Sequence, residues 1–160
     1  MIIRPALLQD VPSISSIILP VFQEGATYAV NPNISAAEAW EYWSGAGRDV
    51  FIAEDDGAIL GTYYLKANQA GRGSHVCNCG YITGAQATGK GIARAMCHHS
   101  LTTARDRGYL AMQFNFVVST NDRAIALWKS LGFMIVGRLP RAFAHPTAGF
   151  VDAYIMWREI

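Results

Sequence analysis

The chain has 160 residues, which is enough for one domain with a sizeable hydrophobic core. Hydrophobic residues make up 51% of it, charged residues make up 16%, and the formal net charge is +1. This composition excludes a disordered protein and a strongly basic nucleic-acid-binding protein. We therefore expect a single domain over residues 1–160, without a nucleic-acid partner, in which any anionic ligand is held locally.

Local patterns in the N-terminal third predict a short strand and two helices. Residues 1–4 favour the strand, and Asp10 is placed to cap a helix that Pro20 is expected to kink or end. Ser35 and Glu38 have the spacing of a capping box, which opens the second helix. Two helices thus precede most of the predicted sheet.

The middle of the chain predicts a hairpin and then a strand that leads into a helix. Strands over residues 50–54 and 59–66 are separated by Asp56-Gly57, a pair typical of tight hairpin turns. Alternation of apolar and small residues predicts the next strand at residues 76–82. A glycine-rich loop follows, and helical spacing of apolar residues begins at Ile92.

The C-terminal part completes the sheet. The helix is expected to stop at Gly108, and a strand follows at residues 110–118. A strand–helix–strand unit is right-handed, so this strand should lie beside residues 76–82 and parallel to them. A cap at residue 120 or 121 opens a last helix, and strands near residues 133–136 and 151–157 finish a mixed sheet.

The loop before the long helix carries the strongest functional signal. Gly89 and Gly91 flank Lys90 at the helix start, where free N–H groups and the helix dipole favour a phosphate group. From Gly84 the segment GAQATGKG nearly matches the P-loop pattern, but Gly91 replaces the hydroxyl that would bind Mg²⁺. A phosphate-loop nucleotide hydrolase is therefore the weaker alternative.

Two motifs resemble those of the GNAT family of N-acetyltransferases. From Thr88 the segment TGKGIA resembles the family's pyrophosphate loop, [QR]-x-x-G-x-[GA], with Gly91 and Ala93 matching and Thr88 in place of Gln or Arg. Residues 121–133 resemble N-x-x-A-x-x-L-Y-x-x-L-G-F, with Trp128 in place of Tyr. The resemblance implies the GNAT acyl-CoA N-acyltransferase fold, an α/β fold of the α+β type whose central mixed, splayed sheet is flanked by helices.

The same resemblance implies acetyl-CoA as the cofactor. It assigns the pyrophosphate to the glycine loop, the pantetheine to the strand before it, and further contacts to the last helix. The cofactor-binding residues implied in this way are Gly80, Tyr81, Ile82, Thr83, Thr88, Gly89, Lys90, Gly91, Ile92, Ala93, Arg94, Asn121, Trp128 and Lys129.

A narrower resemblance concerns the acceptor. Residues 61–68, Cys77-Asn78 and Phe114-Asn115 look similar to fungal N-acetyltransferases that detoxify proline analogues such as azetidine-2-carboxylate. By this resemblance Asn78 and Asn115 handle the substrate, and Tyr28 is a candidate aromatic of the acceptor site. The expected reaction is direct acetyl transfer to the amine of a small molecule, with a proline analogue or another amino acid as candidate acceptor.

The sequence offers no obvious group that would remove the proton from the acceptor amine. Residues 75–83 contain no carboxylate, and an asparagine amide does not accept a proton at neutral pH. We therefore predict a water chain held by Asn78 and Asn115, with Tyr81 and His75 as alternative acid–base groups. Trp128 cannot protonate a leaving sulfur, so a non-catalytic CoA-sensing module is the second hypothesis.

The remaining predictions concern metals, location and assembly. His75, Cys77 and Cys79 share one strand face but lack a fourth ligand at metal-binding spacing, so no metal site is predicted. The N-terminus lacks a secretory apolar region and no run is long enough to span a bilayer, so we expect a cytoplasmic protein without a membrane partner. In GNAT-family proteins, edge strands often pair to form dimers. The resemblance therefore suggests a homodimer, and the sequence itself does not establish the oligomeric state.

Overall fold

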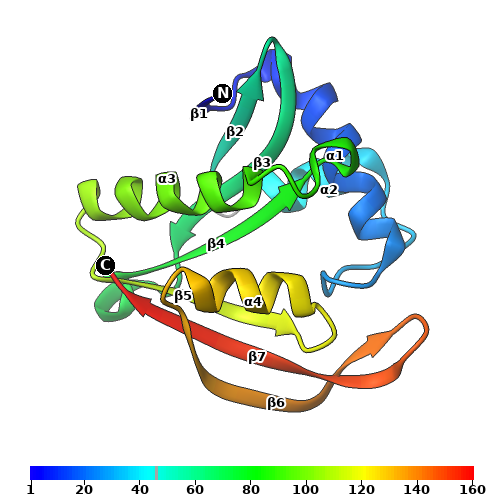
Figure 1. The fold of residues 1–160 in the computed structure, drawn as a ribbon, viewed down its shortest axis with the longest axis vertical. Coiled ribbons are helices and arrows are strands. Elements are labelled where there is room, and N and C mark those ends of the chain that lie inside the picture. Colours follow the sequence, from blue (N-terminus) through cyan, green and yellow to red (C-terminus); the bar gives the residue numbers. More distant parts are fainter. Residues whose placement is uncertain (46) are drawn as a thin grey trace.

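The computed structural model describes residues 1–45 and 47–160 and contains seven strands and four α-helices within them (Figure 1). Their order confirms the predicted succession of strands and helices. Short 3₁₀ turns occur at residues 8–10, 71–73 and 85–87. The elements are β1 (Ile2–Pro5), α1 (Val11–Glu24), α2 (Ala36–Ser44), β2 (Asp49–Asp55), β3 (Ala58–Ala67), β4 (Val76–Thr83), α3 (Ile92–Asp106), β5 (Ala111–Val118), α4 (Asp122–Ser130), β6 (Met134–His145) and β7 (Gly149–Glu159).

The seven strands form one mixed sheet in the order β1-β2-β3-β4-β5-β7-β6. All neighbours are antiparallel except β4 and β5, which are parallel as predicted. The β4–β5 pairing covers Val76 with Ala111 and Cys77 with Met112, and no further pair of these strands is present among the described residues. Beyond Cys77 the two strands separate, as Figure 1 shows, which confirms the predicted splay.

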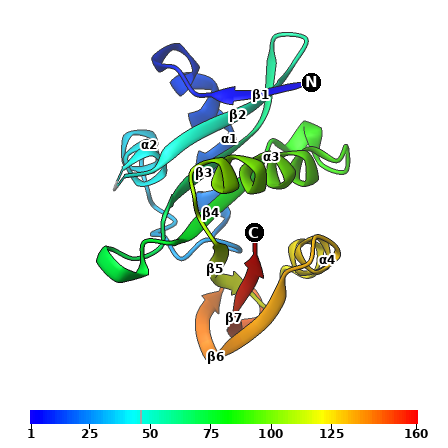
Figure 2. The same cartoon turned by 90° about the vertical axis from the view of Figure 1, so that its left-hand side faces the viewer.

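The helices cover both faces of the sheet and bury two apolar cores. Helices α1 and α2 pack on one face of the N-terminal half, where Ile14, Phe22 and Trp43 are fully buried. Helices α3 and α4 lie on the other face, where Met96 and Cys97 of α3 are fully buried (Figure 2). Strand β4 thus contributes to both cores, while β5 contributes to the core beneath α3 and α4.

Several local predictions are confirmed in detail. The Glu38 N–H donates to Ser35 Oγ at 3.3 Å and the Ser35 N–H donates to Glu38 Oε2 at 2.8 Å, which completes the capping box of α2. Asp56 and Gly57 both have positive φ, 46° and 76°, as a two-residue type I′ hairpin turn requires. Gly108, with φ of 81°, follows the C-terminus of α3 in the left-handed conformation.

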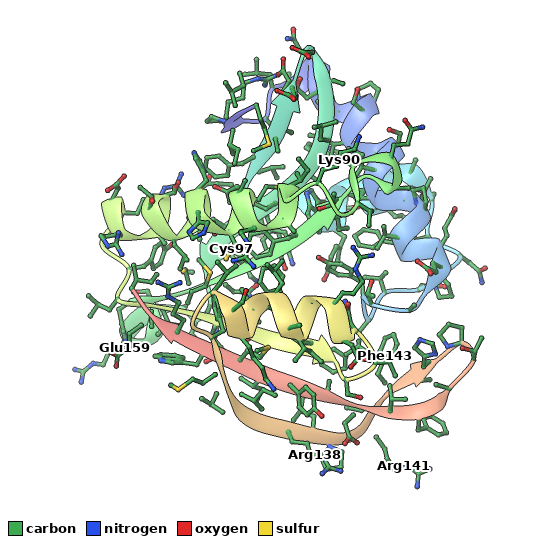
Figure 3. The ribbon with its side chains drawn as sticks, in the orientation of Figure 1. Lys90, Cys97, Arg138, Arg141, Phe143 and Glu159 are labelled. Atoms are coloured by element: carbon green, nitrogen blue, oxygen red, sulfur yellow. The ribbon has the colours of Figure 1, made fainter. Side chains whose placement is uncertain are left out.

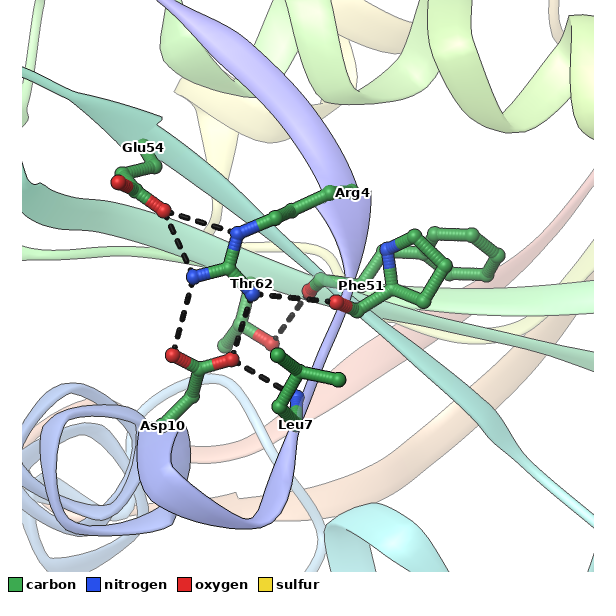
Figure 4. Close-up of polar contacts among 7 residues, drawn as sticks. Arg4, Leu7, Asp10, Phe51, Glu54 and Thr62 are labelled. Atoms are coloured by element: carbon green, nitrogen blue, oxygen red, sulfur yellow. Dashed lines mark hydrogen bonds and ion pairs between the residues drawn. The ribbon is translucent and has the colours of Figure 1, made fainter.

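Asp10 lies at the predicted position before α1, but the prediction that its side chain caps the helix is wrong. Asp10 precedes α1, but its carboxylate makes no capping bond to the helix. It accepts two hydrogen bonds from Arg4, at 2.7 and 3.1 Å, and a third from the Leu7 N–H at 2.8 Å (Figure 4). Arg4 also donates to Glu54 at 2.9 Å, so this network joins β1, the start of α1 and β2. Helix α1 also continues past Pro20 to Glu24.

The last hairpin is much longer than predicted. Strand β6 was expected over four residues but extends from Met134 to His145 and pairs with β7 along its length. Its register shifts twice, between Ile135 and Gly137 and between Leu139 and Phe143, which breaks the alternation that sequence patterns reveal. Pro140 lies within this edge strand, where a missing N–H is tolerated. Figure 3 shows Arg138 and Phe143 along this outer hairpin.

One negative finding concerns membranes. No helix in residues 1–45 and 47–160 combines the length and the apolar composition needed to cross a bilayer.

Candidate functional site

A cavity of about 770 Å³ opens beside the segment in which β4 and β5 separate. It is lined by β4, the loop before α3, β5, α4 and the segment after α1. Every residue predicted for the site lines this cavity except Lys90, Arg94, Lys129 and the acid–base candidate His75. The predicted residues along its wall are Tyr28, Asn78, Gly80, Tyr81, Ile82, Thr83, Thr88, Gly89, Gly91, Ile92, Ala93, Asn115, Asn121 and Trp128.

The glycine loop presents backbone N–H groups to this cavity. Gly89 and Gly91 have φ of 82° and 80°, a conformation that favours glycine. Their N–H groups and those of Ile92 and Ala93, in the first turn of α3, have no protein acceptor within the described residues. A Cβ at either glycine would meet no atom within 4 Å, so the space beside the loop is open. Free donors at a helix N-terminus next to open space suit an anion.

The three basic side chains predicted to assist lie outside the cavity wall. Lys90 is exposed beside the start of α3 (Figure 3), and Lys129 is exposed on α4. Arg94 Nη2 donates to Ser130 Oγ at 2.8 Å, which links α3 to α4. At the glycine loop, the donors that face the cavity are therefore backbone groups and not these three side chains.

The face of β4 toward α1 and α2 is organised by its pairing with β3. Lys66 lies opposite Asn78 and Tyr64 lies opposite Gly80, and directly opposed residues share one face of a sheet. A Cβ at Gly80 would lie 2.5 Å from the Tyr64 ring, so this ring requires glycine beneath it. The Tyr64 hydroxyl lies 3.4 Å from Asn78 Oδ1. Burial raises the pKa of Tyr64 to about 12, so this hydroxyl is neutral at physiological pH.

Asn78 lies where β4 and β5 begin to separate. Its side chain is buried, and Nδ2 donates across the gap to the Gln113 carbonyl at 2.9 Å. Asn115 is exposed, donates to Asn68 Oδ1 at 2.7 Å and accepts from Gln113 Nε2 at 2.8 Å. Both predicted asparagines line the same cavity, and Gln113 contacts both of them.

The two predicted tyrosines differ in where their hydroxyls point. Tyr28 Oη donates to the Tyr81 carbonyl at 3.1 Å and so braces β4 from the α1 side. Tyr81 Oη lies 2.6 Å from Ser100 Oγ, beneath α3 on the opposite face. Burial raises the pKa of both tyrosines, so both hydroxyls are neutral near pH 7. His75, the other acid–base candidate, is exposed and contacts the Arg72 carbonyl outside the cavity wall.

Helix α4 contributes its cap and an aromatic side chain. Asn121 Oδ1 accepts from the Ala124 N–H at 3.2 Å, so Asn121 rather than residue 120 is the cap. Trp128 is 7% exposed, and its ring centroid lies 5.0 Å from that of Tyr81 and 5.1 Å from that of Phe114. Trp128 is therefore both a core side chain and part of the cavity wall.

The residues described do not form a metal centre. No group of three or more His, Cys, Asp or Glu side chains with the arrangement of metal ligands is found among them. Cys77, Cys79 and Cys97 are free thiols in the apolar core, and burial raises the pKa of each.

The sequence matches the Acetyltransferase (GNAT) family over residues 15–133, well over half of the chain. The chain belongs to the GNAT family. N-acetyltransferase aca1 of Schizosaccharomyces pombe is 38% identical over 101 residues, which are 61% of this chain and 47% of that protein. This chain thus spans about half the length of that relative.

Solved GNAT structures agree over nearly the whole chain. A GCN5-related N-acetyltransferase from Kribbella flavida superposes with a TM-score of 0.93 at 37% identity, covering 99% of this chain and 97% of that one. A phosphinothricin acetyltransferase from Sinorhizobium meliloti in complex with acetyl-CoA gives a TM-score of 0.86 at 22% identity, covering 99% and 88%. The second likeness shows the fold, and it confirms the predicted GNAT architecture.

GNAT acetyltransferases use acetyl-CoA, and the residues of this chain fit that cofactor. The open loop at Gly89 and Gly91 offers unpaired N–H groups for a pyrophosphate. The gap between β4 and β5 leaves residues 80–83 without sheet partners on that side, which suits the amides of pantetheine. These are the groups that would hold the cofactor, as the family resemblance implied.

The side chains of the cavity wall that sequence reasoning missed include Arg48, Lys66, Tyr42 and Tyr64. Arg48 Cζ lies 4.9 Å from the centre of the Tyr42 ring and 4.8 Å from that of Tyr64. Lys66 and Tyr64 could have been found from the alternation of β3 once its register with Asn78 was known. Arg48 precedes β2 and reaches the cavity through tertiary packing, for which the sequence gives no local signal.

Proposed function

We propose that this chain is an acetyl-CoA-dependent N-acetyltransferase that transfers the acetyl group directly to the amine of a small molecule, a proline analogue or another amino acid. The observation that carries the proposal is the cavity at the β4–β5 splay, which joins an anion-binding loop to a pocket of polar and aromatic side chains. Family membership supports the reaction class. When bound, acetyl-CoA supplies an acetyl thioester.

The loop and β4 have separate tasks in this proposal. The N–H groups of residues 89–93 hold the pyrophosphate, with Lys90 and Arg94 adding positive charge at the rim. Backbone groups of residues 80–83 orient the pantetheine arm. An N–H near Gly80 or Tyr81 polarises the reacting carbonyl, and one such donor contributes about 3–4 kcal/mol to transition-state stabilisation.

Proton removal from the amine falls to water in this proposal. Asn78 and Asn115 both line the cavity, and each forms a hydrogen bond with Gln113. Their amides can therefore hold a chain of water molecules that carries the proton from the amine to solvent. Tyr81 fits this task less well, because its hydroxyl bonds to Ser100 beneath α3. The indole of Trp128 shapes the wall and can donate a hydrogen bond but no proton.

The competing hypotheses are weaker. The family match overturns the phosphate-loop hydrolase, and Gly91 has no hydroxyl for Mg²⁺. A non-catalytic CoA-sensing module is not favoured, because the chain belongs to a family of acetyltransferases and its cavity extends beyond the cofactor loop to the polar side chains of Asn78 and Asn115. Thiol release from acetyl-CoA should rise with amino-acid acceptors and stay at the hydrolysis rate without one. Tight acetyl-CoA binding in calorimetry, with no acceptor-dependent thiol release across a broad amine panel, would instead support the sensing module.

Assembly and location remain proposals. Strand β6 is an edge strand that exposes Met134 and Val136, and Phe150 of β7 is exposed opposite Ala144, toward the turn of the same hairpin. We propose that this edge pairs with a second copy, in line with the family resemblance. Light scattering that finds a monomer at high concentration would remove the homodimer. A cytoplasmic location stays a prediction from the sequence.

A further inference from the structure

The wall of the cavity on the α2 side carries two positive charges that the cofactor assignment does not use. Arg48 packs between the rings of Tyr42 and Tyr64, which fixes its guanidinium. Its Nη1 donates to the Gly45 carbonyl at 3.2 Å, while its buried Nε has no hydrogen-bond partner within the described residues. A guanidinium has five N–H donors, so most of its capacity is open to a ligand.

Lys66 is the second charge, and it lies beside Asn78 across the β3–β4 pairing. Burial and the nearby Arg48 lower the pKa of its ammonium group, in that order of importance. Neither cation forms a salt bridge with a carboxylate among residues 1–45 and 47–160. Glu24 is the one carboxylate on the cavity wall in the part of the chain that the structure describes.

We propose that Arg48 and Lys66 bind a carboxylate group of the acceptor, and that the acceptor carries this carboxylate and its amine on the same carbon atom. This inference rests on the proposed function and narrows its substrate class to α-amino and α-imino acids. An anion between the two side chains would offset their mutual repulsion. A planar guanidinium can also hold a carboxylate by two parallel hydrogen bonds.

Tyr64 links this charge pair to the reaction centre. Its ring contacts the Arg48 guanidinium, lies directly over Gly80 and places its hydroxyl next to Asn78. The guanidinium is thus one aromatic ring away from the backbone proposed to polarise the acetyl carbonyl. In this proposal an α-amino acid lies along the Tyr64 ring, with its carboxylate at Arg48 and its amine toward Gly80. A polyamine would instead place a second cation beside Arg48 and be repelled.

The test compares each acceptor with its own carboxamide. L-Proline, azetidine-2-carboxylate and a panel of L-amino acids are assayed beside the matching carboxamides by thiol release. We expect kcat/KM to favour the acids by about ten- to a hundred-fold, the range that hydrogen bonds to charged groups confer. In Arg48→Gln this preference should fall by about ten-fold, through a higher KM for the acids and little change for the amides, with the part that Lys66 confers retained.

Arg107→Gln is the matched control. Arg107 also contacts an aromatic ring, Phe51, and a carboxylate, Asp49, but it does not line the cavity. This variant should keep the preference for acids. Arg48→Lys, which keeps a charge but loses the planar fork, should recover part of it.

A measurement on the unmodified protein covers the case in which Arg48→Gln fails to fold. Cyclopentanecarboxylate, which has no amine, should inhibit competitively with the acceptor and not with acetyl-CoA, while cyclopentanecarboxamide should not inhibit. Equal or better rates for the carboxamides, or absence of this inhibition, would overturn the carboxylate site and leave the acetyltransferase in place. Absence of thiol release with every acid, amide and polyamine would overturn the proposed function itself.

Discussion

Asn78 combines a structural and a functional role in one side chain. It bridges the start of the splay to Gln113 and faces the acceptor pocket. Asn78→Ala should lower kcat/KM for the acceptor by about a hundred-fold, if the water chain it holds contributes as general acid–base groups typically do. The affinity for acetyl-CoA should change by less than about three-fold, since the pyrophosphate loop is untouched. Steady-state kinetics and calorimetry provide both numbers.

Asn115→Ala is the companion to this variant. Asn115 is exposed and its hydrogen bonds run to Asn68 and Gln113, so its loss should cost less turnover than the loss of Asn78. Asn78→Ala should also lower the melting temperature, because the buried Gln113 bond is lost, at a cost of about 1–2 kcal/mol. An unchanged rate in a folded Asn78→Ala variant would remove Asn78 from the site.

Trp128 stands where the family motif has a tyrosine, and two variants separate its shape from its chemistry. Trp128→Tyr and Trp128→Phe both shrink a ring packed against Tyr81 and Phe114, so both should destabilise the fold by similar amounts. Tyr alone adds a hydroxyl that can protonate a leaving sulfur. We expect kcat of Trp128→Tyr to equal or exceed that of the unmodified protein and to exceed that of Trp128→Phe. A matching severe loss in both would show that the indole is needed to shape the pocket.

At the scale of the element, the two ends of α3 offer a controlled comparison. Gly91 precedes the helix and Gly108 follows it, with φ of 80° and 81°, and a Cβ at either would meet no atom within 4 Å. Alanine at either position is strained by about 1 kcal/mol or more, so both variants should lose similar stability. Gly91→Ala alone should weaken acetyl-CoA binding, by at least about ten-fold in calorimetry. Equal binding by the two variants would separate the loop from cofactor recognition.

Elements were predictable where their signals are local. The capping box of α2, the type I′ turn at Asp56-Gly57 and the strand–loop–helix at β4 and α3 each depend on neighbours in the sequence, and each is found. The length of β6 was not predictable, because two register shifts and Pro140 hide its pattern. The Asp10 carboxylate was misassigned because a better partner, Arg4, comes from a strand packed beside it.

At the scale of the whole molecule, the two halves of the site differ in how far the sequence reveals them. Most residues predicted to bind the cofactor lie in residues 80–83 and 88–94, a strand and a loop that lead into a helix start, so a local motif was enough to propose them. Asn121, Trp128 and Lys129 were proposed from a second motif in α4. The proposed acceptor half draws on the segment before β2, on β3 and on β4. Strand register places Lys66 opposite Asn78, and Arg48 lines the same cavity. Residue patterns do not reveal that register, so Arg48 and Lys66 could not be assigned to the site from the sequence.

The stability of the whole fold should depend on pH through the network that joins β1, α1 and β2. Hydrogen bonds from Arg4 and from the Leu7 N–H hold the pKa of Asp10 below its usual value, although burial of the carboxyl group acts in the opposite direction. A carboxyl group whose pKa is lower in the folded state stabilises the fold at pH values above its pKa in the unfolded chain, about 3.9. That contribution is lost as the pH falls through the lower, folded value.

Asp10→Asn keeps the shape of the side chain and removes its charge. At pH 7 the free energy of unfolding should fall by about 2 kcal/mol, the usual effect of losing a hydrogen-bonded charge that is largely buried. The difference from the unmodified protein should begin to shrink below about pH 4, where Asp10 of the unfolded chain takes up a proton, and should be lost only as the pH falls through the lower pKa of the folded state. Urea unfolding followed by tryptophan fluorescence measures both values. Asp106→Asn, at an exposed position, should shift stability by less than about 0.5 kcal/mol. A loss of the same size at pH 3 and pH 7 would show that Asp10 acts through packing and not through its charge.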